Sequence, residues 1–285
     1  MSKITVENVS FVYGAKTPFE TLALDDVSVN IEENCITGII GHTGSGKSTL
    51  VQMFNGLLKP TSGRILLDGV DIWQDHKRIG DVRYRVGLVM QYPEYQLFEE
   101  TVEADIAYGP KNMGLDSDEI KRRVAEASDF VGLDKANLKK SPFDLSGGQK
   151  RRAAIAGVMA MRPEVLVLDE PSAGLDPAGK SAIFEGIKKY AEATGSSVII
   201  VSHSMDDMAK YCENIIVMSQ AKAVMSGKRH EIFSRGDELE RIGLGVPQMT
   251  YLARLLVASG VDIPENIYTV DEAEKALARL LGGAV

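Results

Sequence analysis

The segment GHTGSGKST, Gly41 to Thr49, is the part of this 285-residue sequence that decides the expected fold. It satisfies the pattern G-x-x-x-x-G-K-[ST], which is typical of a loop that binds phosphate groups. The apolar run CITGII precedes the loop and the helix-like run LVQMFNGLL follows it, which is the context that supports the pattern. We therefore expect a phosphate-binding loop between a strand and a helix, rather than a flexible stretch of glycine and serine.

The chemistry of this loop assigns a role to each member. The glycines let backbone N–H groups close around phosphate oxygens, and the start of the following helix adds its partial positive charge. Lys47 is expected to reach the β- and γ-phosphates of a nucleotide, and Ser48 to offer its hydroxyl to Mg²⁺. The other members are assigned to phosphate binding: Gly41, His42, Thr43, Gly44, Ser45, Gly46 and Thr49.

Four short apolar runs are each followed at once by a glycine or a polar residue. They are CITGII before Gly41, VGLVM before Gln91, VLVL before Asp169 and SVIIVS before His203. Short β-branched runs fit buried parallel strands, and ligands collect at the carboxyl ends of such strands in open α/β sheets. The sequence therefore predicts an α/β core with these four residues at one edge of its sheet.

Two adjacent carboxylates, Asp169 and Glu170, end the run VLVLDEP. Acidic turns are common, so this pair is weak evidence by itself, but beside a phosphate-binding loop it becomes strong. Asp169 suits the coordination shell of Mg²⁺, and Glu170 suits activation of an attacking water. We therefore expect both carboxylates in the reaction site.

The rest of the chain divides by its patterns. Asp68-Gly69 lies between apolar segments in the N-terminal third, which is a strong hairpin signal. Helix signals replace strand signals from Gln91 to Pro163, including SDEIKRRVAEASDFVGL with Ser117 as its expected N-cap and Gly132 as its end. We interpret this part as a helical insertion in the α/β core.

Two amphipathic helices are expected after Gly227. The run PQMTYLARLLVASG places apolar residues on one helical face, and TVDEAEKALARLL opens with a capping box formed by Thr269 and Glu272. We expect these two capped helices to form a small C-terminal module. It either pairs subunits or packs only against its own core.

The segment DLSGGQKRRAAIAGVMA starts a helix with two glycines. Glycine is unfavourable in a helix, which makes sense where the backbone must approach an anion closely. An ordinary N-capped helix after a loose loop is the alternative. Lys150, Arg151 and Arg152 form either a local basic patch or a solvated helix face.

The motif LSGGQ, taken with the phosphate-binding loop, Gln91, the strand-end LDE and His203, resembles the ATP-binding cassette (ABC) ATPase family over roughly residues 3–225. The resemblance implies a head-to-tail dimer in which one subunit's signature segment caps the γ-phosphate of ATP in the other. That segment consists of Ser146, Gly147, Gly148 and Gln149.

The same resemblance implies five further roles. Tyr13 would stack on adenine, Gln91 would sense Mg²⁺ and the attacking water, and Glu170 would be the general base. His203 would contact the γ-phosphate, and Asp176 would cross the dimer interface. For Tyr13 an ordinary strand aromatic is the alternative, and for His203 a buried core histidine.

Two longer stretches, QYPEYQLFEETVEADIAYGPKNMG and LGVPQMTYLARLLVASGVDIP, resemble the ATPases of energy-coupling factor (ECF) transporters, specifically the second of their two types. The resemblance implies a subunit that binds and hydrolyses ATP, with Mg²⁺, to drive import of a vitamin or metal ion. Its partners would be a homologous ATPase, a transmembrane coupling protein and a small substrate-capturing membrane protein. A heterodimer of ATPases is favoured over a homodimer, and the transported substrate is not encoded here. An ATPase of another ABC permease and a soluble ABC-class ATPase remain alternatives. A non-hydrolysing subunit with a degenerate nucleotide site is a third, against which Lys47, Glu170 and His203 argue.

The implied architecture is a P-loop NTPase (RecA-like) core with an antiparallel β subdomain, an α-helical insertion at about residues 95–160 and a small helical C-terminal domain. We expect a nucleotide-binding domain over residues 1–228 and a C-terminal dimerisation domain over 229–285. The net charge of −8 argues against a broad nucleic-acid surface. Without a signal pattern or an apolar run near ~20 residues, the chain is expected to be cytoplasmic. The resemblance to ECF transporter ATPases implies a peripheral subunit at the cytoplasmic face of the membrane.

The stretch QYPEYQLF divides between two expected roles. Gln91 is assigned to the ATP site, and the next seven residues to the membrane partner. Pro93 is expected to bias Tyr92 towards an extended conformation. Apolar area would come from Tyr95, Leu97 and Phe98, and charge for basic partner residues from Glu94, Glu99 and Glu100. Alternatively, the aromatic side chains only fix the helical insertion to the core.

Overall fold

The computed structural model describes residues 2–282; Met1 and residues 283–285, which the domain expectations include, lie outside the described residues. Its centre is a six-stranded sheet with the order β10-β9-β3-β8-β7-β6. The strands are β3 (Ile36–Gly41), β6 (Val86–Val89), β7 (Val165–Asp169), β8 (Ser197–Val201), β9 (Asn214–Ser219) and β10 (Lys222–Lys228). Strands β6, β7, β8, β3 and β9 run parallel to their neighbours, and β10 pairs antiparallel with β9. All four apolar runs are therefore strands, as predicted.

Alternate residues of the parallel strands face two separate cores, because successive side chains of a strand point to opposite faces. Ile39, Val167 and Ile199 belong to the core shared with the N-terminal strands. Leu166 and Ile200 belong to the core shared with the helical insertion. The sheet is thus covered on both faces, which explains the continuous apolar runs.

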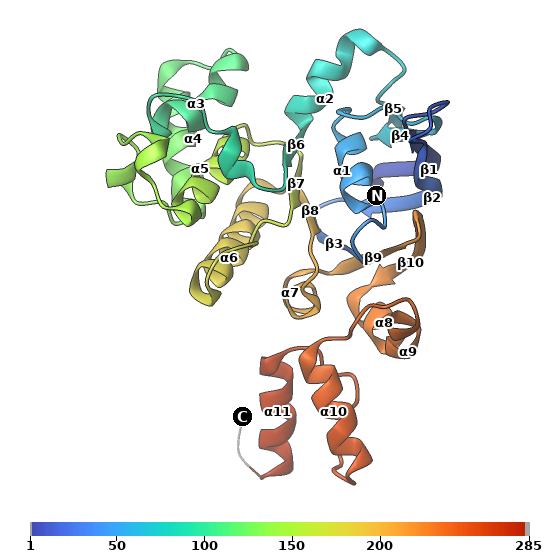
Figure 1. Ribbon diagram of the computed structural model, residues 1–285. Coiled ribbons are helices and arrows are strands. Elements are labelled where there is room, and N and C mark those ends of the chain that lie inside the picture. The colour runs from blue at the N-terminus through green and yellow to red at the C-terminus, as the bar shows by residue number, and fades with distance from the viewer. Residues whose placement is uncertain (1, 283–285) are drawn as a thin grey trace.

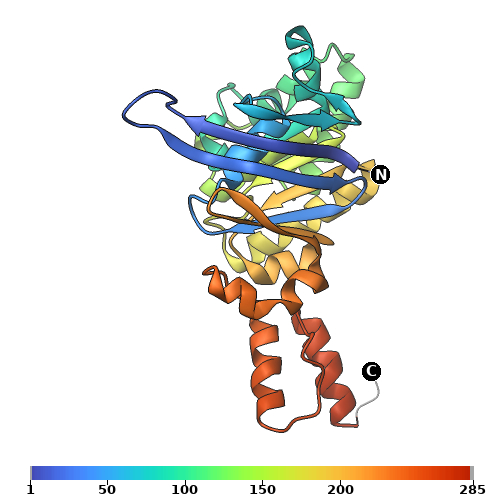
Figure 2. The ribbon, with the colours of Figure 1, turned by 90° about the vertical axis from the view of Figure 1, so that its right-hand side faces the viewer.

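A second, antiparallel sheet has the order β2-β1-β4-β5. Its strands are β1 (Ser2–Tyr13), β2 (Thr21–Glu32), β4 (Ser62–Leu67) and β5 (Val70–Asp71). Asp68 and Gly69 join β4 to β5 with φ of 51° and 78°, so both adopt the left-handed conformation of a tight hairpin, as predicted. Helix α1 (Lys47–Phe54) shares the core of this sheet. Figure 2 shows β1 and β2 as a long ribbon that crosses the molecule.

The helical insertion forms a group of its own beside β6 and β7 (Figure 1). Its elements are η2 (Pro93–Gln96), α3 (Val102–Asn112), α4 (Ser117–Phe130), η3 (Lys135–Asn137), η4 (Pro142–Asp144) and α5 (Gly147–Met159). The predicted N-cap Ser117 is wrong: Asp116 caps α4, because its extended backbone lets the carboxylate accept from the amides of Asp118 and Glu119. Gly132 adopts φ of 63° just after the helix, as expected of its end.

The remaining helices connect the sheets or follow them. They are η1 (His76–Arg78), α2 (Ile79–Arg85), α6 (Pro177–Thr194), α7 (Met205–Tyr211), α8 (Arg229–Ser234), α9 (Gly236–Arg241), α10 (Gln248–Ala258) and α11 (Val270–Leu280). None of the helices described within residues 2–282 is both long and apolar enough to cross a bilayer.

The C-terminal part has two kinds of packing. Phe233 of α8 and Leu239 of α9 are buried in the core of the helical face of the sheet. Helices α10 and α11 extend away from the rest of the chain and share a small core around Ala253 and Ala273 (Figures 1 and 2). The capping box of α11 is present, but α10 begins after Pro247 without a side-chain cap of its own. The expectation of two self-capped helices is therefore wrong for α10.

Candidate active site

The phosphate-binding loop runs from the end of β3 into α1, and its glycines are required by close packing. A Cβ atom at Gly41 would lie 2.3 Å from the Met218 carbonyl oxygen, and one at Gly46 would lie 2.4 Å from the Ala23 carbonyl oxygen. Gly46 also has φ of 99°, a conformation that favours glycine. These contacts hold the loop backbone against β9 and β2, so its N–H groups have fixed directions.

Lys47 is buried at this loop, with 6% of its surface exposed. Its ammonium donates hydrogen bonds to the carbonyl oxygens of Gly41 and His42, at 2.7 and 2.9 Å. Burial lowers the pKa of Lys47, while the carboxylates of Glu170 and Asp169 oppose that shift. The ammonium of Lys47 thus lies near two carboxylates, an arrangement suited to a polyphosphate with a bound divalent ion.

Asp169 ends β7 and is 5% exposed. Burial raises its pKa, and a hydrogen bond from Ser48 and the charge of Lys47 lower it in part. The hydroxyl of Ser48 therefore lies next to the carboxylate of Asp169. Hydroxyl and carboxylate oxygens are ligands that Mg²⁺ binds in phosphate sites, so this pair fits that ion.

Glu170 adopts a left-handed backbone with φ of 53°, which is uncommon for a residue other than glycine. Its carboxylate is mostly buried, and Oε1 lies 3.3 Å from Nε2 of His203. Burial and the neighbouring charge of Asp169 raise the pKa of Glu170 to about 7. A carboxylate with a pKa near neutrality is well matched to general-base chemistry.

His203 follows β8 and is half exposed, with 53% of its side chain accessible. Its pKa is lowered, first by partial burial and then by the charge of Lys47. The alternative of a buried core histidine is therefore wrong, because the ring lies at the open edge of the sheet beside Glu170. Its backbone leads directly into α7, which Ser204 caps.

Gln91 lies just after β6 at the same edge and is exposed. The expected extended conformation of Tyr92 is wrong, because this residue is left-handed with φ of 57° and ψ of 54°. A following proline disfavours the right-handed helical region but leaves the left-handed one accessible. Pro93 then opens η2, where its fixed φ suits the first position of a helical turn.

Tyr13 ends β1 beside the phosphate-binding loop. Its hydroxyl lies 3.3 Å from that of Thr49, and its ring meets Phe11 edge-on at 4.8 Å. With 42% of its surface exposed, the ring is open to a ligand at the rim of the loop.

The signature segment and Asp176 open two helices, and each has a local hydrogen-bonding role. The Ser146 hydroxyl accepts from the amide of Gln149 at 3.3 Å, and the Gln149 side chain accepts from the amide of Ser146 at 2.9 Å. Asp176 accepts from the amide of Gly179 at 2.7 Å and so caps α6. Gly147 is exposed and Gly148 partly exposed. The N-capped helix considered for this segment is therefore present, and it leaves the segment accessible from outside.

The ABC transporter family profile matches residues 24–173. The energy-coupling factor transporter ATP-binding protein EcfA2 of Caldanaerobacter subterraneus subsp. tengcongensis is 53% identical, over 98% of each chain. The solved structure of cbiO1 from Clostridium perfringens, part of the ABC transporter complex cbiONQ, has a TM-score of 0.75 and 39% identity, over 89% of this chain and 99% of that one. A dimeric cassette in a post-hydrolysis state, bound to ADP and Pi, has a TM-score of 0.72 and 27% identity, over 79% of this chain and 98% of that one.

This chain is an ABC ATPase of the ECF branch.

The sequence did not reveal one buried ion pair of this ABC ATPase. Arg151 of α5 is 3% exposed, and its guanidinium contacts the Glu94 carboxylate of η2 at 2.8 and 3.0 Å. Arg152 instead donates to the carbonyl oxygens of Val131 and Gly132, at the end of α4. The three basic residues are therefore neither one basic patch nor one solvated face. Arg151 and Glu94 are separated by 57 residues in the sequence, so no local spacing could have indicated the pair.

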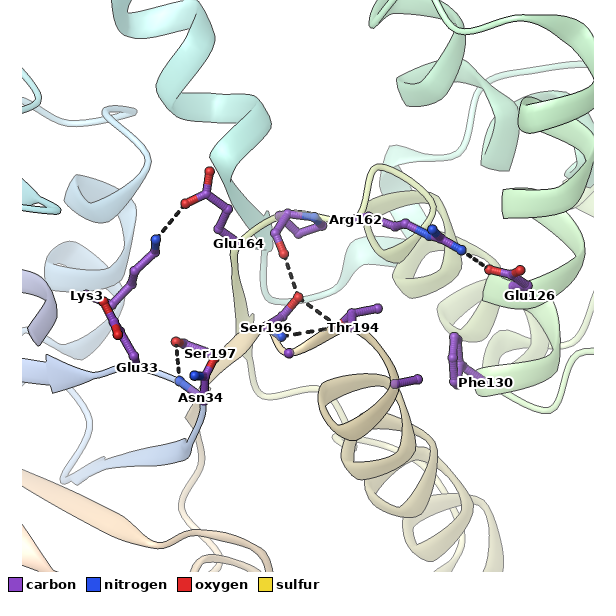
Figure 3. A pocket seen from close by; sticks show the side chains of 13 residues that line it. Lys3, Glu33, Asn34, Glu126, Phe130, Arg162, Glu164, Thr194, Ser196 and Ser197 are labelled. Carbon is purple, nitrogen blue, oxygen red and sulfur yellow. Dashed lines mark hydrogen bonds and ion pairs between the residues drawn. The ribbon is translucent and has the colours of Figure 1, made fainter. Parts of the chain in front are cut away.

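A cleft of about 710 Å³ lies at the opposite, amino-terminal edge of the sheet in this ABC ATPase. Figure 3 shows its charged side chains: Lys3 contacts Glu164 at 2.6 Å, and Arg162 pairs with Glu126. Because both cations that line this cleft already have carboxylate partners, its charge gives no reason to place phosphates there.

Proposed function

We propose that this chain works beneath the membrane as one of two homologous ATPases that drive an ECF transporter for a vitamin or a metal ion. The activity follows from family membership: the chain is an ABC ATPase, an ATP-hydrolysing subunit of an ECF transporter. What we infer beyond this concerns the residues, the metal ion and the partners.

The residues at the sheet edge divide the reaction among them. The loop amides and Lys47 hold the phosphates, and Tyr13 stacks on adenine. Ser48, Asp169 and Gln91 would hold Mg²⁺, which neutralises charge on the phosphates. Glu170 takes a proton from the attacking water, and His203 contacts the γ-phosphate. The pKa of Glu170, near 7, supports its assignment as the base.

The second ATPase completes the site. We infer that Ser146, Gly147, Gly148 and Gln149 of one subunit cap the γ-phosphate held by the other, and that Asp176 crosses the interface. The exposure of the signature segment supports this role, because the segment's own capping leaves it free to meet another chain. A heterodimer is our preferred form, since the chain resembles one of two ATPase types.

The exposed aromatic side chains after Gln91 are the observation that carries the membrane role. Tyr95 is 85% exposed, Phe98 is 60% exposed, and Phe98 meets the ring of the exposed Tyr108 edge-on at 4.9 Å. Leu97, by contrast, packs against the core, and Glu94 is paired with Arg151. The expectation that Glu94 serves a partner is therefore wrong, but Tyr95 and Phe98 suit a helix of the transmembrane coupling protein.

Replacing Tyr95 and Phe98 together by Ser tests this surface. We expect the variant to lose co-purification with the coupling and substrate-capturing membrane proteins and to lose transport, while the isolated chain keeps its ATP affinity. Tyr84→Ser is the matched control, because Tyr84 is an exposed aromatic of α2. Normal assembly by the double variant would remove the proposed docking surface.

The C-terminal residues, about 229–285, are proposed to hold subunits together. The exposed face of α10 supports this, because Tyr251, Leu252 and Leu255 are 59%, 38% and 49% exposed at helical spacing. A truncation after Lys228 would remove core residues of α8 and α9, so point variants are the better test. We expect Tyr251→Ser with Leu255→Ser to weaken pairing with the second ATPase in sedimentation without nucleotide; Glu274→Gln of α11 is the control. Unchanged pairing would contradict the dimerisation role.

A further inference from the structure

Helix α7 begins two residues after His203 and is held by other elements on two sides. On one side it contacts α6: Lys180 meets the carboxylate of Asp207 at 2.5 Å, and Tyr211 stacks on Phe184 at 4.8 Å. On the other side it contacts the C-terminal helices. The helix that follows His203 therefore contacts both the ATPase core and the C-terminal module.

The first contact with the module is at the start of α10. This helix has no side-chain cap of its own, and the amide of Gln248 donates to Oδ1 of Asp206 at 2.8 Å. A carboxylate that accepts from a first-turn amide stabilises a helix start in the way an N-cap does. Asp206 of α7 thus supplies the side-chain cap that α10 lacks. It lies only three positions after His203.

The second contact runs to the start of α11. Arg229 donates to the carbonyl oxygen of Ala209 in α7 and pairs with the carboxylate of Glu272 at 3.1 Å. The other oxygen of Glu272 accepts from the amides of Tyr268 and Thr269, which completes the capping box. Both helices of the module are therefore linked to α7 through their first turns.

We propose that Asp206 and the Arg229–Glu272 pair are positioning residues for His203, through which the C-terminal module sets the contact of this histidine with the γ-phosphate. The proposal rests on the proposed role of His203. Movement of α10 and α11 when subunits pair would shift α7 as a unit, because the links lie near both of its ends. Pairing of the modules and γ-phosphate binding are then coupled within one chain.

The test compares binding of the non-hydrolysable ATP analogue AMP-PNP and of ADP to the full-length chain, by titration calorimetry. His203→Ala defines the γ-phosphate contribution. We expect Asp206→Ala to lower the preference for AMP-PNP over ADP about three- to tenfold, the scale of one lost hydrogen bond. ADP affinity should stay unchanged. Asp206→Asn retains an acceptor oxygen and should restore the preference.

Glu272→Gln breaks the second link independently and should lower the preference in the same direction. Glu274→Gln, an exposed position of the same helix, is the matched control. An unchanged preference in Asp206→Ala and Glu272→Gln, or an equal loss for both nucleotides, overturns the inference alone. An unchanged preference in His203→Ala overturns the proposed role of His203 and the inference with it.

Discussion

The carboxyl ends of strands β7 and β6 lie side by side at one edge of the sheet. After each strand the backbone turns through a left-handed residue that is not glycine. Glu170 after β7 has φ of 53°, and Tyr92 after β6 has φ of 57°. After β7 the turn keeps a carboxylate mostly buried beside Asp169 and His203. After β6 it leads to a surface where Tyr95 is 85% exposed.

The comparison shows that the same left-handed backbone conformation occurs in two different surroundings. A left-handed residue at a strand end reverses the chain sharply, and its cost of about 1–3 kcal/mol persists only where the surroundings require it. At Glu170 the surroundings are ionic and buried, so the strained turn fixes a reactive group. At Tyr92 the neighbouring Glu94–Arg151 pair is mostly buried, and the turn leads to the exposed surface that we propose for docking.

Glu170→Gln should break the catalytic side of this comparison with the largest effect. We expect turnover to fall about 10²- to 10⁴-fold, the usual contribution of a general base, with ATP still bound. Steady-state ATP hydrolysis of the purified chain checks it. Glu100→Gln removes an exposed carboxylate after β6 and should leave turnover near that of the unmodified chain. Comparable losses in both variants would contradict the division between the two strand ends.

The position of the phosphate-binding loop, Asp169 and Glu170 at strand ends could be predicted from the sequence because each lies in a short local segment. A phosphate loop needs its glycines in one short segment, and Asp169 with Glu170 ends an apolar run. The parallel sheet then brings these segments to one edge without further information. The open position of His203, by contrast, depends on how α7 packs, which no local pattern records.

Removing one partner of the Glu94–Arg151 pair should have the next largest effect, on folding. The side chains of Arg151 and Glu94 are 4% and 17% exposed, so Arg151→Met leaves a mostly buried carboxylate without its cation. We expect a loss of about 3–5 kcal/mol in urea unfolding, and recovery of much of it when Glu94→Leu is added. Lys222→Met breaks the exposed pair with Asp25 and should cost about 1 kcal/mol or less.

An equal cost for the buried and the exposed pair would show that the turn after β6 does not depend on Arg151. This ion pair could not be predicted, because the partner that stabilises the buried charge comes from a distant segment of the chain. We expected Arg151 to be a surface charge and Glu94 to contact a partner because charged side chains are usually exposed. In the structure the two side chains are mostly buried against each other.

Glu170→Gln should also change stability, in the opposite direction to its effect on turnover. In the folded chain the pKa of the Glu170 carboxyl group is about 7, while in an unfolded chain it is near 4.5. The carboxylate therefore destabilises the folded state above pH 4.5, increasingly up to pH 7. We expect the variant to be more stable by roughly 1–3 kcal/mol at pH 8 and by less at pH 6, in urea unfolding. A gain that is equal at both values would place the pKa of Glu170 outside this window.

We expect the smallest effect from replacing the aromatic side chains after β6. This test distinguishes docking to a partner from anchoring the helical insertion to the core. If Tyr95 and Phe98 fixed the helical insertion to the core, replacing them would destabilise the isolated chain. Because both are mostly exposed, we expect Tyr95→Ser to change the free energy of unfolding by no more than ~0.5 kcal/mol. Phe98→Ser should cost about 1 kcal/mol, since its ring contacts Tyr108. Leu97→Ala, whose side chain packs against the core, should cost more than either. The reverse order in urea unfolding would make the aromatics anchors, and the contrast between the two strand ends would then be one of degree.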